Sequence, residues 1–124
     1  MIVLGPTATG KTKLAVQLAN ALDGEVVSVD SRQVYRGLDI GSGKDLHEYG
    51  SVPNHLIDVA EIQQEYSLFN YLCDCRRVLK SISKAGRLPL FAGGTGLYLD
   101  ALLNAYRLLD VPSNELLREE LRTL

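Results

Sequence analysis

Short apolar runs alternate with longer segments of helical periodicity along most of this chain. Residues 1–4 and 88–92 are apolar runs that lead into glycine, and residues 25–29 are β-branched and apolar, so each is predicted to be a buried strand. Over residues 12–22 apolar side chains recur every three or four positions, which is typical of one face of a helix. Strands that alternate with helices predict an α/β fold with a mostly parallel sheet.

Further helices are predicted in the second half of the chain. Ser67 is a suitable N-cap for a helix that extends to about residue 85, and Gly86 follows as its C-cap. Residues 95–106 have the pattern of another helix. Pro112-Ser113 is predicted to cap a last amphipathic segment.

The pattern breaks between the first two predicted strands and the long helix. Residues 31–51 are a loop interrupted by glycines, and residues 55–59 are predicted to form one more short strand. A loop of this length in a compact domain is usually functional.

Composition narrows the class of protein. A chain of 124 residues has room for one domain, and its net charge of −2 argues against a free-standing RNA-binding domain. Cys73 and Cys75 would point in different directions on a helix, so they are predicted to be reduced thiols rather than metal ligands. The chain shows no signal peptide and no apolar run of about 20 residues, so we expect a cytoplasmic protein with no membrane partner.

One motif carries clear chemistry. Residues 5–12 read GPTATGKT and fit the P-loop pattern G-x-x-x-x-G-K-[ST] at every fixed position. The predicted phosphate-binding residues are Gly5, Pro6, Thr7, Ala8, Thr9, Gly10, Lys11 and Thr12. Lys11 would supply a charge to the terminal phosphate, and Thr12 would offer its hydroxyl to Mg²⁺. With a strand before it and a helix after it, this motif predicts a P-loop NTPase-like three-layer domain.

Two further groups are predicted at the same edge of the sheet. Asp30 follows the strand 25–29, beside a P-loop expected on the neighbouring strand, and could either hold Mg²⁺ or accept a proton from a substrate. Residues 93–96 read GGTG, so their backbone must approach either a ligand or a packed helix closely. Thr95 could also serve as a helix N-cap.

These motifs together resemble a known family. GPTATGKT at residues 5–12, DSRQVYRGLDIGSGK at 30–44, HLIDV at 55–59 and GGTGLYL at 93–99 occur in the order found in tRNA dimethylallyltransferases, the isopentenyl-tRNA transferase family. The resemblance extends over residues 2–121, and the block at 30–44 is more diagnostic than the P-loop. Family members usually have about 300 residues, so residues 1–124 would be the single P-loop prenyltransferase core domain of a longer architecture.

The resemblance implies transfer of a dimethylallyl group from its diphosphate to the exocyclic amine of the adenosine 3′ of a tRNA anticodon. It implies that Asp30 is the catalytic base, that Thr95 assists it and that Lys11 acts on the diphosphate. Asp30, Ser31, Arg32 and Gln33 would contact the RNA, and Mg²⁺ would be the cofactor, with Thr12 as its ligand. The expected partners are dimethylallyl diphosphate and a tRNA anticodon stem-loop, bound by a monomer.

Other interpretations stay open from the residues alone. The chain could prenylate free adenine nucleotides, phosphorylate a small molecule through Asp30 and Lys11, or bind phosphate without turnover. His55 is predicted to be a structural hydrogen-bonding residue and Asp58 to be a weaker metal candidate. A run of basic residues on the long helix predicts a solvated face or, less favoured, a phosphate-contact surface. It comprises Arg76, Arg77, Lys80, Lys84 and Arg87.

Overall fold

The computed structural model describes residues 1–6, 8–108, 112 and 114–124. Four strands form one sheet in the order β1-β4-β2-β3, and each of its strand pairs is parallel. In chain order the elements are β1 (Ile2–Leu4), α1 (Lys11–Leu22), β2 (Gly24–Val29), the 3₁₀ helix η1 (Leu46–Tyr49), β3 (Asn54–His55), α2 (Leu68–Lys84), β4 (Leu88–Gly93), α3 (Gly96–Leu103) and α4 (Glu115–Arg122). The predicted α/β class with a parallel sheet is confirmed.

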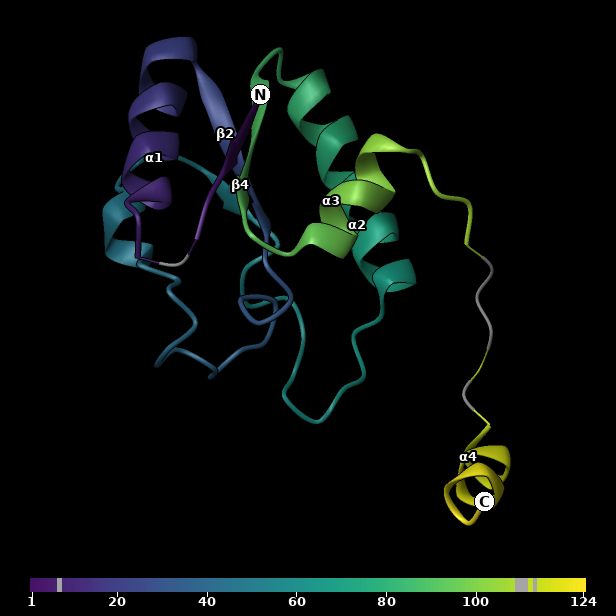
Figure 1. The fold of residues 1–124 in the computed structure, drawn as a ribbon. Coiled ribbons are helices and arrows are strands. Elements are labelled where there is room, and N and C mark those ends of the chain that lie inside the picture. The colour runs from purple at the N-terminus through teal and green to yellow at the C-terminus, as the bar shows by residue number, and fades with distance from the viewer. Residues whose placement is uncertain (7, 109–111, 113) are drawn as a thin grey trace.

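The elements form three layers (Figure 1). Helix α1 covers one face of the sheet, and α2 and α3 cover the other. Strand β2 is buried along its whole length, and its side chains alternate between the two cores. Val26 packs with Ala15 of α1, whereas Val27 packs with Tyr71 of α2. The carboxyl ends of the strands therefore open at a single edge, where the P-loop and the segment after β2 emerge.

Helix boundaries follow the predicted signals with three adjustments. Ser67 caps α2 as predicted, because its hydroxyl accepts from the amide of Asn70 and the Asn70 side chain accepts from Ser67. The C-cap of α2 is Ala85 rather than Gly86, which follows it in the left-handed conformation. Helix α3 begins at Gly96, after Thr95 as its N-cap, and ends at Leu103 instead of residue 106.

The start of α4 also differs from the prediction. Its N-cap is Asn114, whose side chain accepts from the amide of Leu117 at 3.1 Å. Pro112 lies two residues earlier, and the predicted cap residue Ser113 lies outside the described residues. Asparagine is a strong N-cap because its side-chain oxygen satisfies a first-turn amide.

Two strand predictions were wrong in detail. Strand β1 is an edge strand of the sheet and buries Val3 only, whereas Ile2 and Leu4 are exposed. Strand β3 has two residues instead of the five predicted at 55–59. Leu56 and Asp58 have φ angles of 64° and 55°, which take the chain out of the extended conformation directly after His55.

The order of the strands changes the geometry of the site. Strand β2 was predicted to neighbour the P-loop strand, but β4 lies between β1 and β2. Gly93 ends β4 and pairs with Leu4 on one side and Val29 on the other. A Cβ atom at Gly93 would lie 2.2 Å from the carbonyl oxygen of Val29, so only glycine fits there. The GGTG sequence predicted a close approach to a ligand or a helix, but at Gly93 the close approach is between β4 and β2. The ends of β1, β4 and β2 therefore lie together.

We expect Gly93→Ala to lower the free energy of unfolding by about 1–3 kcal/mol or more, because 1–3 kcal/mol is the usual cost of overpacking. Gly94→Ala is the matched control, because a Cβ atom there would lie an ordinary 3.5 Å from the carbonyl oxygen of Gly5. Denaturant unfolding of both variants measures the difference. Equal stability of the two variants would contradict the packing argument.

Candidate functional site

The P-loop turns back sharply before α1. Gly10 is the N-cap of α1 with a left-handed φ of 83°, and Ala8 is also left-handed with a φ of 62°. The first amides of a helix have no intrahelical acceptor, and the helix dipole adds positive potential at this end. This geometry is compatible with the predicted anion site, while Thr7 lies outside the described residues.

The charge of Lys11 is held inside this loop. Its Nζ donates to the carbonyl of Pro6 at 2.5 Å, and the hydroxyl of Thr9 donates to the same carbonyl at 2.7 Å. A phosphate that binds here must draw the ammonium away from one neutral carbonyl oxygen. The replacement would be a charge-assisted hydrogen bond, which is stronger.

Asp30 lies directly after β2, and its side chain is 14% exposed. Its Oδ1 accepts from the amide of Arg32 at 2.8 Å and from the amide of Gln33 at 3.4 Å, which fixes the orientation of the carboxylate. Among the described residues, no hydrogen bond occupies Oδ2. One oxygen of the carboxylate is thus an anchor, and the other can accept a proton.

Thr95 ties the end of β4 to the segment after β2. Its Oγ1 accepts from the amide of Ser31 at 2.9 Å, and its own amide donates to the carbonyl of Val29 at 3.0 Å. The hydroxyl also donates weakly to the Ser31 hydroxyl at 3.5 Å. Thr95 therefore stands beside the Asp30 segment, as the predicted partnership requires, and fixes its start.

The predicted catalytic residues meet around one small cavity of about 140 Å³. It is lined by Gly5, Pro6, Lys11, Asp30, Arg32, Gly94 and Thr95. A second, largely apolar cavity of about 320 Å³ adjoins it and shares four of those residues. Its lining is Leu4, Gly5, Pro6, Gly94, Thr95, Gly96 and Leu99. A polar chamber next to an apolar one suits a ligand with a charged head and a hydrocarbon tail.

A third cavity of about 240 Å³ lies on the other side of Lys11. Thr12, Asp30 and Gln33 line it, and so do Ser42, Gly43, Asp45, Glu48 and Tyr49 from the long loop. These loop residues were not among the site residues predicted from the sequence. The available signal was the spacing of Gly37, Gly41 and Gly43, each of which adopts a left-handed φ and shapes the loop.

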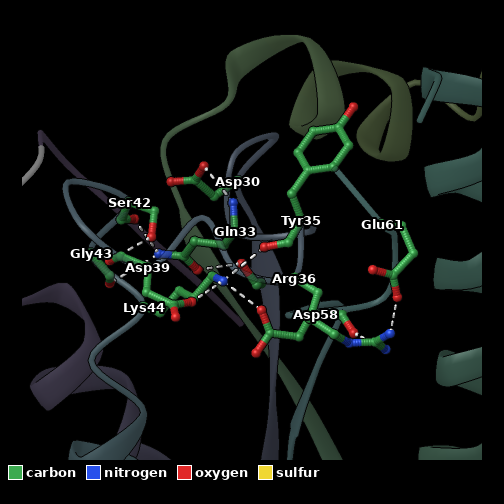
Figure 2. Close-up of polar contacts among 11 residues, drawn as sticks. Asp30, Gln33, Tyr35, Arg36, Asp39, Ser42, Gly43, Lys44, Asp58 and Glu61 are labelled. Carbon is green, nitrogen blue, oxygen red and sulfur yellow. Dashed lines mark hydrogen bonds and ion pairs between the residues drawn. The ribbon is translucent and has the colours of Figure 1, made fainter. Parts of the chain in front are cut away.

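Gln33 holds this loop in place (Figure 2). Its Nε2 donates to the carbonyls of Ser42 and Gly43, both at 3.0 Å, and its Oε1 accepts from the hydroxyl of Ser28 at 2.8 Å. Both donors of the Gln33 amide are thus engaged within the protein. Of the four residues predicted to contact RNA, Ser31 and Gln33 are already bonded to other parts of the chain. Arg32 has an exposed side chain, and its Nε lies 3.7 Å from Asp30 Oδ1.

Tyr49 brings η1 against the start of α1. It is buried, and it lines the same cavity as Thr12. Burial raises the pKa of Tyr49 to about 12, the nearby Thr12 hydroxyl opposes this rise, and the charges of Asp45 and Glu48 add to it. Tyr49 is therefore a neutral phenol at physiological pH and helps to position the predicted metal-binding hydroxyl.

The residues around Thr12 fit Mg²⁺. Hydroxyl and carboxylate oxygens are its preferred ligands, and Mg²⁺ usually takes few of them from the protein because it keeps waters and phosphate oxygens. Thr12, Asp30 and Asp45 line the same cavity. Within the described ranges, no three His, Cys, Asp or Glu side chains form a complete metal cluster. These oxygen donors would suit an ion that also takes ligands from a bound phosphate.

The remaining predicted residues have structural roles. His55 Nε2 lies 2.5 Å from the Glu25 carboxylate, toward the amino end of β2 and away from the P-loop, so the structural interpretation of His55 is confirmed. Asp58 pairs with Lys44 at 2.5 Å. Cys73 and Cys75 are free thiols, as predicted.

The basic run on α2 is not one continuous face. Arg77 pairs with Asp74, and Arg76 donates to the carbonyl of Tyr106. Arg87 lies beyond the end of α2 and pairs with Asp23 at 3.1 Å, so its placement on the helix was wrong. Taking the described helices alone, none combines the length and apolarity needed to cross a membrane.

Comparison with known proteins is consistent with this geometry. A family model described as IPP transferase matches residues 33–124, and a model described as isopentenyl transferase matches residues 1–52. A "tRNA dimethylallyltransferase 2" from Treponema denticola is 55% identical over 121 residues, which are 98% of this chain and 41% of that protein. Its counterpart from Trichlorobacter lovleyi is 59% identical over 98% of this chain and 40% of its own length.

Solved structures agree in fold. The tRNA isopentenylpyrophosphate transferase of Bacillus halodurans superposes with a TM-score of 0.83 and 43% identity, over 98% of this chain and 41% of that one. A eukaryotic dimethylallyltransferase described as acting on tRNA superposes with a TM-score of 0.80 and 30% identity, over 93% and 30% of the two chains. The sheet and its P-loop thus have the P-loop NTPase-like fold of these enzymes. This chain spans about two-fifths of the length of the curated relatives it matches.

Proposed function

Because the chain belongs to the IPP transferase family, we propose that it carries the catalytic core for transfer of a dimethylallyl group from dimethylallyl diphosphate to RNA. The proposed acceptor is the exocyclic amine of the adenosine 3′ of a tRNA anticodon. The proposed partners are the diphosphate, Mg²⁺ and the anticodon stem-loop. We take the working species to be a monomer in the cytoplasm.

The observation that carries the proposal is the meeting of Lys11, Asp30 and Thr95 around one cavity, with an apolar cavity next to it. A five-carbon allylic group is apolar, and its diphosphate is highly charged. The charged end would lie on the P-loop against Lys11, and the hydrocarbon would enter the cavity lined by Leu4 and Leu99. A nucleoside triphosphate has no apolar tail for that second cavity.

Ionisation of the allylic diphosphate requires that the negative charge of its leaving group be stabilised. Lys11, the helix N-terminus and the amides of the P-loop provide fixed positive charge where this charge develops. When bound, Mg²⁺ would neutralise further charge on the diphosphate, with the Thr12 hydroxyl as its protein ligand. Tyr49 would hold that hydroxyl in place.

The acceptor amine is a weak nucleophile because its lone pair is delocalised into the adenine ring. As the N–C bond forms, the amine must lose a proton, and we assign Asp30 Oδ2 as its acceptor. The Arg32 and Gln33 amides keep the carboxylate in one orientation through Oδ1. A positioned base of this kind contributes about 10²–10⁴-fold to a rate.

The proposal is separated from phosphoryl transfer by the product released. The polypeptide is incubated with Mg²⁺ and either dimethylallyl diphosphate plus an anticodon stem-loop, or ATP plus small hydroxyl acceptors. We expect RNA-dependent pyrophosphate release in the first mixture and no acceptor-dependent ADP in the second. The opposite outcome would replace prenyl transfer with kinase activity, in which Asp30 would activate a hydroxyl.

A further inference from the structure

Three residues of the loop that follows the Asp30 segment depart from the usual rule of burial. Ile40 at its tip is 98% exposed, whereas the polar residues Ser42 and Lys44 are 2% and 4% exposed. Serine and lysine are mostly surface residues, and a large apolar side chain is normally at least partly covered. A single exposed apolar residue is ordinary. Ile40 differs because the buried polar side chains of Ser42 and Lys44 anchor the loop on which it is exposed.

The loop is held firmly on both sides of Ile40. Residues that precede Ile40 are held by Lys44. Its Nζ donates to Asp39 Oδ1 at 2.7 Å and to the Tyr35 carbonyl at 2.8 Å, and also to Asp58 Oδ1 at 2.5 Å (Figure 2). These bonds use all three donors of the ammonium. Burial lowers the pKa of Lys44, but the hydrogen bonds to both carboxylates outweigh it and raise the pKa above its usual value. The ammonium is therefore charged at neutral pH.

The following side of Ile40 is held by different contacts. The Gln33 amide binds the carbonyls of Ser42 and Gly43, and the Ser42 hydroxyl donates to the Asp39 carbonyl at 3.2 Å. Ser42 and Gly43 line the cavity that also contains Lys11 and Asp30. Ile40 thus stands two residues from the wall of the site, on a loop fixed before and after it.

We propose that Ile40 is an RNA contact, packing against the face of a nucleobase next to the acceptor adenosine. This inference rests on the proposed function. An adenosine that enters the cavity leaves the stack of its loop, and its neighbours then expose apolar faces to water. An apolar side chain on an anchored loop that also forms part of the cavity wall can cover such a face. Arg32, whose side chain is 53% exposed at the same edge, supplies a charge for the adjoining phosphates.

The test compares four single variants with the unmodified protein. Binding of a fluorescent anticodon stem-loop is followed by anisotropy, and pyrophosphate binding by calorimetry. Ile40→Ser should weaken RNA binding by about tenfold, the scale of an important interface side chain. Ile40→Leu should bind nearly as the unmodified protein does. Ile62→Ser is the matched control, because Ile62 is also an exposed isoleucine but has no cavity-lining residue within two positions of it.

Asp39→Ala tests whether the loop must be held for this contact. It removes one leg of the Lys44 cluster but leaves Asp58 and the Tyr35 carbonyl, so the ammonium keeps two acceptors. We expect weaker RNA binding in Asp39→Ala and a smaller additional loss when Ile40→Ser is combined with it than when Ile40→Ser is made alone. Pyrophosphate affinity should stay unchanged in every variant.

Three results would overturn the inference. If Ile40→Ser binds the stem-loop as tightly as the unmodified protein, Ile40 makes no RNA contact while the proposed function stands. If Ile62→Ser loses as much affinity as Ile40→Ser, the effect is not specific to this loop. If the unmodified protein binds pyrophosphate but no RNA, the proposed RNA substrate is wrong and the inference falls with it.

Discussion

Replacing Asp30 with asparagine is expected to slow prenyl transfer by about 100-fold or more, with pyrophosphate affinity nearly unchanged. The amide oxygen of asparagine can still accept from the Arg32 amide, so the segment should keep its shape. The asparagine side chain cannot, however, take a proton from the adenine amine. The expected change therefore falls on the chemical step, because we assign the diphosphate contacts to the P-loop, Lys11 and Thr12 rather than to Asp30.

Single-turnover transfer of a labelled dimethylallyl group to a stem-loop measures this effect, and calorimetry with pyrophosphate and Mg²⁺ measures binding. Asp23→Asn is the matched control, because Asp23 caps the far end of α1 and pairs with Arg87 away from the cavities. Transfer at the unmodified rate would show that Asp30 is not the base. A joint loss of transfer and of Mg²⁺-dependent pyrophosphate binding would identify it as a metal ligand instead.

Lys11→Ala is expected to weaken pyrophosphate binding by about 1.5–3 kcal/mol, the range of a hydrogen bond to a charged group. The lysine now bonds the Pro6 carbonyl, so its gain on binding is the difference between a neutral acceptor and a charged one. Calorimetry in the presence of Mg²⁺ gives the value directly.

Lys13→Ala provides the control for net charge, because Lys13 is exposed in the first turn of the same helix. A loss confined to Lys11→Ala would assign the effect to the P-loop contact. Equal losses in both variants would reduce the role of Lys11 to general positive potential.

Local features of the sequence predicted most of the elements and the edge of the sheet at which the candidate site residues lie. Ser67 caps α2 because a hydroxyl at that position satisfies a free amide of the first turn, and the alternation within β2 reflects burial on both faces. The P-loop and Asp30 were placed correctly because the ends of parallel strands meet at one edge of the sheet. Each of these inferences needs only neighbouring residues and the parallel topology.

The unpredicted features depend on residues far apart in the chain. The insertion of β4 between β1 and β2 is a choice of topology, and it left β1 at the edge with Ile2 and Leu4 exposed. The burial of Lys44 depends on Asp58, which reaches it only after the chain turns at η1 and β3. Hydrophobic periodicity carries no information about either feature.

The central claim is that this cleft attaches an allylic group to an adenine amine. The most direct measurement is nucleoside analysis by mass spectrometry of an anticodon stem-loop incubated with the polypeptide, dimethylallyl diphosphate and Mg²⁺. The account predicts one dimethylallyl group on the exocyclic nitrogen of the adenosine 3′ of the anticodon, and its loss when that adenosine is replaced by guanosine. Unmodified adenosine in the presence of both bound substrates, or a dimethylallyl group at any other position, would contradict it.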